Sequence, residues 1–142
     1  MQPTNRKAET GVTKSDLEQL SDFRYRLRQF LHFSERILHD AGLTPLQYML
    51  MLHTCAFPDR SWATVGEIAE RLQASSHGTV ALVTRCEAAG LVTRHASLHD
   101  RRQVEIHLTP KGESCLRTVA TLHKSEIRSF GWAFQDVTAP NA

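Results

Sequence analysis

The chain has 142 residues, of which 41% are hydrophobic and 23% are charged, a composition typical of one soluble globular domain. It contains no apolar run of the roughly 18 residues needed to span a bilayer and no apolar signal segment at its start, so we expect a cytoplasmic protein without a membrane partner. The net charge is +2, but residues 71–112 carry six Lys and Arg against three acids, a surplus of three. A basic segment on a near-neutral body is typical of a nucleic-acid footprint, and a solvated charged face is the alternative.

Residues 1–14 are polar and lack periodic apolar positions, which predicts a flexible N-terminal tail. Residues 15–44 then carry apolar side chains at helical spacing from Leu17 to Ala41, about seven turns. Ser15 followed by Glu18 matches the capping box at the start of a helix. Because a helix of this length exceeds what one small core needs, we expect one end of it to pack against a second subunit.

Thr44-Pro45 marks the start of the next helix, with threonine as N-cap and proline at the first helical position. Its predicted buried face consists of Leu46, Met49, Leu50, His53 and Phe57. The segment Trp62–Thr64 could form a short strand that pairs with a hairpin later in the chain.

Two short helices follow, separated by a tight turn. Thr64 and Glu67 form a second capping-box pattern, and Ser75 or Ser76 caps the helix that ends at Gly90. The apolar face of that second helix is predicted at Val80, Leu82, Val83 and Cys86. Two helices joined in this way are a helix-turn-helix, whose second helix can enter the major groove of DNA.

The N-terminal residues of a recognition helix face the base edges, so the candidate DNA contacts are Ser75, Ser76, His77, Gly78 and Thr79. They are small or hydrogen-bonding, and the helix N-terminus offers free N–H groups to phosphate. The alternative is that they only cap the helix at a polar turn. Arg85 could contact a phosphate or pair with a nearby acid.

Residues Gly90–Gly112 are predicted to form two strands around a charged loop. Val104, Ile106 and Leu108 alternate with polar residues, and Leu91–His95 alternates more loosely. The polar tip between the strands, 97–102, is predicted to lie outside the core. A hairpin of this size is not stable alone and is expected to pack against helices.

This stretch resembles the MarR-type winged helix-turn-helix transcription regulators. The matching motif is Asp100-x-Arg102, five residues, Leu108-Thr109, two residues and Gly112, preceded by Gly90-Leu91-Val92-x-Arg94. The resemblance covers roughly residues 15–130.

The resemblance implies that Arg102 at the wing tip enters the minor groove and that Asp100 orients its guanidinium, with Arg101 and Lys111 as phosphate contacts. A surface ion pair that holds the turn is the alternative reading of Asp100 and Arg102. Gly78 departs from the serine, threonine or alanine usual in the family.

Thr109-Pro110 begins a final helix whose apolar stripe runs along one face: Gly112, Leu116, Val119, Ala120, His123, Ile127, Phe130, Gly131 and Phe134. The resemblance implies that the terminal helices of two subunits interlock into a dimer. The chain departs from the family pattern after residue 135, where no further C-terminal helix is expected.

Together these patterns predict a mainly α fold with a small β-hairpin wing, a winged helix-turn-helix with long dimerisation helices at both ends. We expect a flexible tail at 1–14, a dimerisation helix at 15–44, the DNA-binding unit at 45–112, a second dimerisation helix at 113–135 and a tail at 136–142. The expected function is a dimeric repressor that binds an inverted repeat in double-stranded DNA.

The trigger that relieves repression is less defined. The resemblance implies a small aromatic or lipophilic effector, for which the candidate lining is Phe30, Phe33, Ile37, His53 and Phe57. A thiol trigger at Cys115 and a metal trigger at the scattered histidines are alternatives, although neither ligand clusters nor paired cysteines occur. We expect no cofactor, no metal site and no enzymatic activity, since nucleophile elbows and phosphate-binding glycine loops are absent. A winged-helix module that binds protein instead of DNA is the remaining alternative.

Overall fold

The computed structural model describes residues 11–138, with side chains described for 11–125 and Arg128. The elements in chain order are α1 (Lys14–Asp40), α2 (Pro45–Cys55), β1 (Trp62–Thr64), α3 (Val65–Leu72), α4 (Ser76–Ala88), β2 (Val92–Ala96), β3 (Val104–Leu108) and α5 (Pro110–Thr138). A mainly helical chain with a small antiparallel sheet confirms the predicted winged-helix fold class. Within the described residues, the helices are all too short or too polar to cross a membrane.

Helix α1 begins one residue earlier than predicted and with a different cap. The hydroxyl of Thr13 accepts from the backbone N–H of Asp16, and the Asp16 carboxylate accepts from the Thr13 N–H. The prediction of a Ser15–Glu18 capping box was therefore wrong. Both pairs have the required spacing of three, and aspartate supplies the same reciprocal bond as glutamate.

Helix α2 confirms the predicted Thr44 cap and lies among most of the other elements, contacting α1, α3, α4, α5, β1 and β3. Its fully buried residues are Tyr48, Leu50, Met51 and Thr54. The predicted buried face was wrong, because Leu46 and Met49 are exposed and only Leu50 of that set is fully buried. A helix surrounded by partners has no single inward stripe, so apolar periodicity does not identify its buried side.

The sheet has the strand order β1-β3-β2 and is antiparallel throughout. Residue Ala63 pairs with Ile106, which in turn pairs with Arg94 on β2. The predicted third strand at Trp62–Thr64 is thereby confirmed. The apolar residues of the face shared by Ala63 and Ile106 enter the core, where Ile68, Val83 and Leu50 meet them.

Helix α5 is fastened to the end of α4 through the segment around Gly112. The hydroxyl of Thr109 donates to the carbonyl of Gly90 (2.5 Å) and accepts from the N–H of Gly112 (3.0 Å). A Cβ atom on Gly112 would lie 2.0 Å from the carbonyl oxygen of Leu91. Only glycine allows the first turn of α5 to sit against that backbone.

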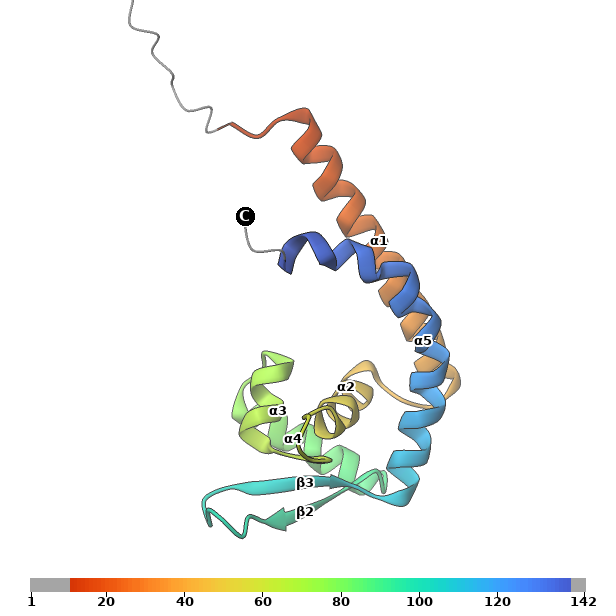
Figure 1. Ribbon diagram of the computed structural model, residues 1–142. Coiled ribbons are helices and arrows are strands. Elements are labelled where there is room, and N and C mark those ends of the chain that lie inside the picture. The colour runs from red at the N-terminus through yellow and green to blue at the C-terminus, as the bar shows by residue number, and fades with distance from the viewer. Residues whose placement is uncertain (1–10, 139–142) are drawn as a thin grey trace, which may run out of the picture.

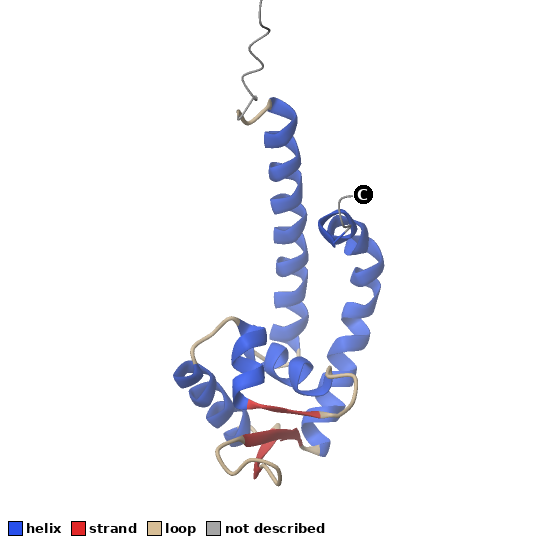
Figure 2. Cartoon of the chain, turned by 60° about the vertical axis from the view of Figure 1, so that its left-hand side comes forward, coloured by secondary structure: helices blue, strands red, loops and turns tan. Residues whose placement is uncertain are grey.

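Figures 1 and 2 show the overall arrangement. Helices α1 and α5 rise side by side from a body made of α2, α3, α4 and the sheet, and the hairpin lies at the end of the molecule opposite to the free tip of α1. Helix α5 continues to Thr138, three residues beyond its predicted end. The predicted stripe residues Ile127, Phe130, Gly131 and Phe134 lie outside the described side chains, as do residues 1–10 and 139–142 of the two predicted tails.

Candidate nucleic-acid interface

The helix-turn-helix formed by α3 and α4 is held by caps at both helix starts. Thr64 and Glu67 make the predicted capping box on α3. The turn passes through Gln73 in the left-handed conformation (φ 51°), and Ser75 caps α4 by accepting from the N–H of Gly78 at 3.0 Å. Of the two predicted candidates for this cap, Ser75 and Ser76, the structure selects Ser75, and this cap fixes where the recognition helix starts.

Thr79 cannot reach DNA from its position in α4. Its side chain is only 1% exposed, and its hydroxyl donates to the carbonyl of Ser75 at 2.8 Å. The prediction of Thr79 as a DNA contact was therefore wrong. Conversely, Val80 was predicted to be buried, but it is 42% exposed. Because Ser75 is the cap, Thr79 lies on the side of the helix that also carries the buried Leu82, Val83 and Cys86, and this side faces the core.

The other candidate contacts of α4 are accessible. Ser76, His77, Gly78 and Arg85 are exposed, and the Ser75 hydroxyl is exposed but already engaged by Gly78. Between residues 11 and 125, Arg85 takes part in none of the ion pairs. Its guanidinium is therefore available to a phosphate.

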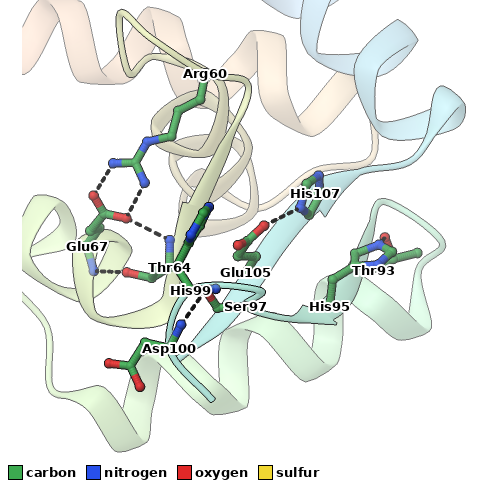
Figure 3. A network of polar contacts seen from close by, with 10 residues as sticks. All are labelled: Arg60, Thr64, Glu67, Thr93, His95, Ser97, His99, Asp100, Glu105 and His107. Carbon is green, nitrogen blue, oxygen red and sulfur yellow. Dashed lines mark hydrogen bonds and ion pairs between the residues drawn. The ribbon is translucent and has the colours of Figure 1, made fainter. Parts of the chain in front are cut away.

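The wing loop is ordered by its own polar groups. The hydroxyl of Ser97 accepts from the backbone N–H groups of His99 and Asp100, both at 3.3 Å, and Figure 3 shows this bond to Asp100. Ser97 is only 7% exposed, so the prediction that all of 97–102 lies outside the core was wrong at this residue. A short hydroxyl side chain can be buried here because it accepts bonds that the turn would otherwise lack.

Asp100 fixes the wing tip through the backbone. Its carboxylate accepts from the backbone N–H of Arg102 at 2.9 Å, so the implied bond to the Arg102 guanidinium is replaced by one to the main chain. Arg101 and Arg102 are exposed, and neither belongs to an ion pair in the described part of the chain. Two such cations on an ordered loop form a positive tip suited to a phosphate-lined groove.

Lys111 has a structural partner that the sequence did not reveal. Its ammonium donates to the carbonyl of Ala89 at 3.0 Å, at the C-terminal end of α4. A cation at this end of a helix satisfies a carbonyl that lacks an intrahelical donor. The ammonium has three donors, so this bond leaves two for a phosphate.

Arg94 on β2 joins the wing to the recognition helix. Its guanidinium donates to the hydroxyl of Thr84 (2.5 Å) and lies 3.5 Å from the Glu87 carboxylate, both on α4. The sequence placed Arg94 in the motif but indicated no role for it. Its partners lie seven and ten residues earlier on another element, so no local spacing could have identified them.

The solvent face of the sheet and the loop before it carry a network of polar and aromatic side chains, of which Figure 3 draws Arg60, Glu67, His95 and His107. Trp62 stacks on His107, whose ring meets His95 edge-on at 4.7 Å between centroids. Nearby, the Arg60 guanidinium lies 4.5 Å from the Phe57 ring centroid and 4.4 Å from that of Trp62, and it pairs with Glu67. The sequence patterns above did not predict this network, although Phe57 and Trp62 on either side of Arg60 are a visible signal in the sequence.

Burial raises the pKa of the Glu67 carboxyl, but the Arg60 guanidinium and the Thr64 backbone and hydroxyl groups outweigh it, so the pKa of Glu67 lies below its ordinary value. The carboxylate is thus ionised at neutral pH. It fixes both the start of α3 and the loop that precedes β1.

The three cysteines differ in burial, and Cys86 is the buried one. Burial raises the pKa of Cys86 to about 11, so this thiol is protonated and unreactive at neutral pH. Burial also raises the pKa of Cys55, with a further contribution from Glu113. Cys115 is half-buried beside a shallow groove between α1 and α5. Among the described residues, no group of three or more His, Cys, Asp or Glu side chains is arranged to hold a metal ion.

Comparison with known proteins gives consistent matches. The MarR family model matches residues 41–103. The chain is 28% identical over 129 residues to YsmB, an uncharacterized HTH-type transcriptional regulator of Bacillus subtilis (strain 168), covering 88% of this chain and 86% of the relative. It superposes on AbsC, a MarR family transcriptional regulator from Streptomyces coelicolor, with a TM-score of 0.74 and 25% identity, over 92% of this chain and 85% of AbsC. Reduced AbfR bound to DNA matches with a TM-score of 0.63 and 27% identity, over 85% of this chain and 89% of AbfR.

Proposed function

Because the chain belongs to the MarR family of transcriptional regulators, we propose that it is a homodimeric repressor that binds double-stranded DNA at an inverted repeat. The family consists of regulators and not enzymes. In the proposed complex α4 enters the major groove, and the wing reaches the adjacent minor groove with Arg102. The observation that carries the proposal is the pair of exposed arginines, Arg101 and Arg102, on the ordered wing tip.

Each proposed contact has a distinct chemical task. Ser76 and His77 face base edges or phosphates at the start of α4, and Gly78 lets the helix backbone approach. The Ser75 cap contributes through backbone position, since its hydroxyl is engaged within the helix. Arg85, Arg101 and Lys111 are proposed phosphate contacts. Asp100 acts on Arg102 indirectly, by fixing the backbone from which that side chain projects.

The proposed dimer is supported by an apolar stripe on α1. Leu38 is buried at the lower end of the helix, and Leu17, Leu20 and Leu31 lie on the same face but are 48–57% exposed. The described part of one chain therefore leaves uncovered a stripe that starts in the core and continues into solvent. A second copy would cover it and place two recognition helices on one operator.

The proposed trigger is a small aromatic or lipophilic molecule that relieves repression. Three half-buried side chains of α1 and α2, Phe30, Ile37 and His53, support it. Phe57 is excluded from this set, because its ring packs against the guanidinium groups of Arg60 and Arg71. A panel of phenolic acids that raises the melting temperature and weakens DNA binding would support this trigger.

The function is tested with a duplex selected by the full-length protein from a random double-stranded library. The Arg102→Ala variant is expected to weaken binding to that duplex about 10- to 100-fold, the range for removing one good base-edge interaction. The slope of log affinity against log salt should also become shallower, by about 0.9 for each phosphate that is no longer neutralised. The matched control is Arg36→Ala on α1, an exposed arginine outside the proposed interface.

Two outcomes would favour the alternatives. If the wild-type protein binds no duplex at low salt, the DNA-binding function fails and the protein-interaction module remains. If DNA binding is normal but is abolished by peroxide and preserved in a Cys115→Ser variant, the trigger is a thiol instead of a small ligand. A reporter gene under the selected operator decides repression against activation.

A further inference from the structure

The exposed side of α4 carries two apolar residues, Val80 and Ala81. Both lie three or four residues from His77 and from Thr84, so these four exposed residues share one side of the helix. The buried residues of α4, Thr79, Leu82, Val83 and Cys86, occupy the opposite side. A helix that packs on a core with one apolar side usually carries polar residues on the other. Here the exposed side also presents a valine, Val80, which is 42% exposed, and an alanine, Ala81.

The hydroxyl groups of α4 that could read bases are mostly engaged within the protein. The Thr79 hydroxyl is buried and donates to the carbonyl of Ser75. The Thr84 hydroxyl donates to the carbonyl of Val80 (3.0 Å) and accepts from Arg94 (2.5 Å). The hydrogen of the Thr84 hydroxyl is thus in use and one acceptor position remains, while the same side chain also carries a methyl group.

One base offers an apolar surface in the major groove, namely thymine through its C5-methyl group. From these observations we propose that Val80, with Ala81 and the Thr84 methyl beside it, reads thymine methyl groups in each half-site. His77, one turn nearer the helix start, supplies the hydrogen-bonding contact on the same face. This inference rests on the proposed DNA-binding function and adds the chemical feature that the recognition helix selects.

The surroundings of this face favour DNA over a protein partner for two reasons. The wing beside it ends in the exposed cations Arg101 and Arg102, and α4 is tied to the wing through Arg94. Gly78 is also exposed, and the nearest atom that a Cβ there would meet is the Ser75 hydroxyl at 3.1 Å. A glycine in the first turn of α4 lets the helix backbone approach a groove closely.

The test uses the duplex selected by the full-length protein and the same duplex with deoxyuridine in place of every thymidine, which removes only the methyl groups. The wild-type protein is expected to bind the uracil duplex about fourfold more weakly per half-site, the factor for removing one buried methyl-sized group. For a symmetric duplex read by both copies, the expected reduction in affinity is about fifteenfold.

Variants assign that reduction to Val80. The Val80→Ala protein should bind the thymine duplex more weakly and lose most of its preference for thymine over uracil, whereas Val80→Ile should retain the preference. The matched control is Val12→Ala, which removes the same atoms from a valine that is 69% exposed ahead of α1. Thermal melts establish that the variants are folded, which is expected because Val80 lies on the surface.

The test distinguishes failure of the proposed DNA-binding function from failure of this inference. If the wild-type protein binds neither duplex, the proposed DNA-binding function fails, and this inference fails with it. If it binds both duplexes equally well and with sequence preference, DNA binding stands and the reading of thymine methyl groups is overturned. Equal discrimination by wild type and Val80→Ala overturns the role of Val80.

Discussion

Single residues of this protein matter most where the backbone leaves no room. Gly112 is such a position, since its Cα lies against the carbonyl group of Leu91. The motif that contains Gly112 is recognisable from the sequence as a family pattern, and the structure supplies the physical reason for the glycine. The close approach joins the base of the wing to the first turn of α5, so it affects both the DNA-binding unit and the long helix above it.

Replacing Gly112 with alanine is expected to lower the free energy of unfolding by about 1–3 kcal/mol or more. This range is the usual cost of overpacking a tight site. The matched control is Gly66→Ala on α3, where an added Cβ meets nothing within 4 Å. That change should stabilise the protein by about 0.5–1 kcal/mol, because alanine favours helix. Urea denaturation of the three proteins checks both signs, and equal stabilities would contradict the steric account.

At the same scale, Lys111 combines a structural bond with a proposed DNA contact. Lys111→Met removes the donor to Ala89 while keeping the aliphatic stem, so we expect a loss of about 0.5–1.5 kcal/mol of stability. The salt dependence of DNA binding by the same variant tests the second role. A slope identical to that of the wild type would reject the phosphate contact and leave only the helix cap.

In the DNA-binding unit, some side chains of one structural element bond to a second element and so hold the two together. Arg94 links β2 to α4, and Glu67 links the loop before β1 to the start of α3. The position of the wing relative to the recognition helix therefore depends on ion pairs and hydrogen bonds as well as on the apolar core. This coupling is what the proposed simultaneous reading of two grooves requires.

The Glu67→Gln variant tests, through pH, the link between the loop before β1 and the start of α3. The pKa of Glu67 is lowered in the folded protein, so its contribution to stability is present above the unfolded pKa of about 4.3 and is lost as pH falls through the lower folded value. We expect the variant to be less stable by about 1–3 kcal/mol near neutral pH, because Arg60 loses the nearer of its two charged partners, Glu67 and Asp59. The difference from wild type should shrink as the pH falls below about 4.

Denaturation at several pH values measures this effect, and Glu70→Gln is the matched control. Glu70 is on the same helix but exposed, so its substitution should change stability little at any pH. A Glu67→Gln deficit that stays constant down to acidic pH would show that the carboxylate's charge does not contribute.

At the scale of the whole molecule, the exposed stripe on α1 is the feature that one chain leaves unsatisfied. Leu20→Glu places a charge in its exposed part, where the leucine is 57% exposed in a single copy. We expect this variant to remain folded, because the stripe lies above the core, but to sediment as a monomer at concentrations where wild type is a dimer. Its affinity for an inverted repeat should fall to that of a single half-site.

The matched control for that prediction is Leu98→Glu on the wing loop. Leu98 is 96% exposed and lies at the opposite end of the molecule, so the variant should sediment like wild type. Wild-type sedimentation as a monomer at all concentrations would contradict the dimer proposal. A dimeric Leu20→Glu protein would instead place the dimer contact on another surface.

The sequence alone determined the elements with strong local chemistry. Thr44 and Thr64 were identified as helix caps, the cap of α4 was narrowed to Ser75 or Ser76, and the alternation of Val104, Ile106 and Leu108 identified the strand. Caps and alternation involve residues close in the chain. Only the tertiary structure decided which sides of those elements are free. It buried Thr79 and Ser97, exposed Val80, and bonded Lys111 and Arg94 to α4. These outcomes depend on which element packs against which, and such contacts join residues too far apart in the chain for spacing to reveal them.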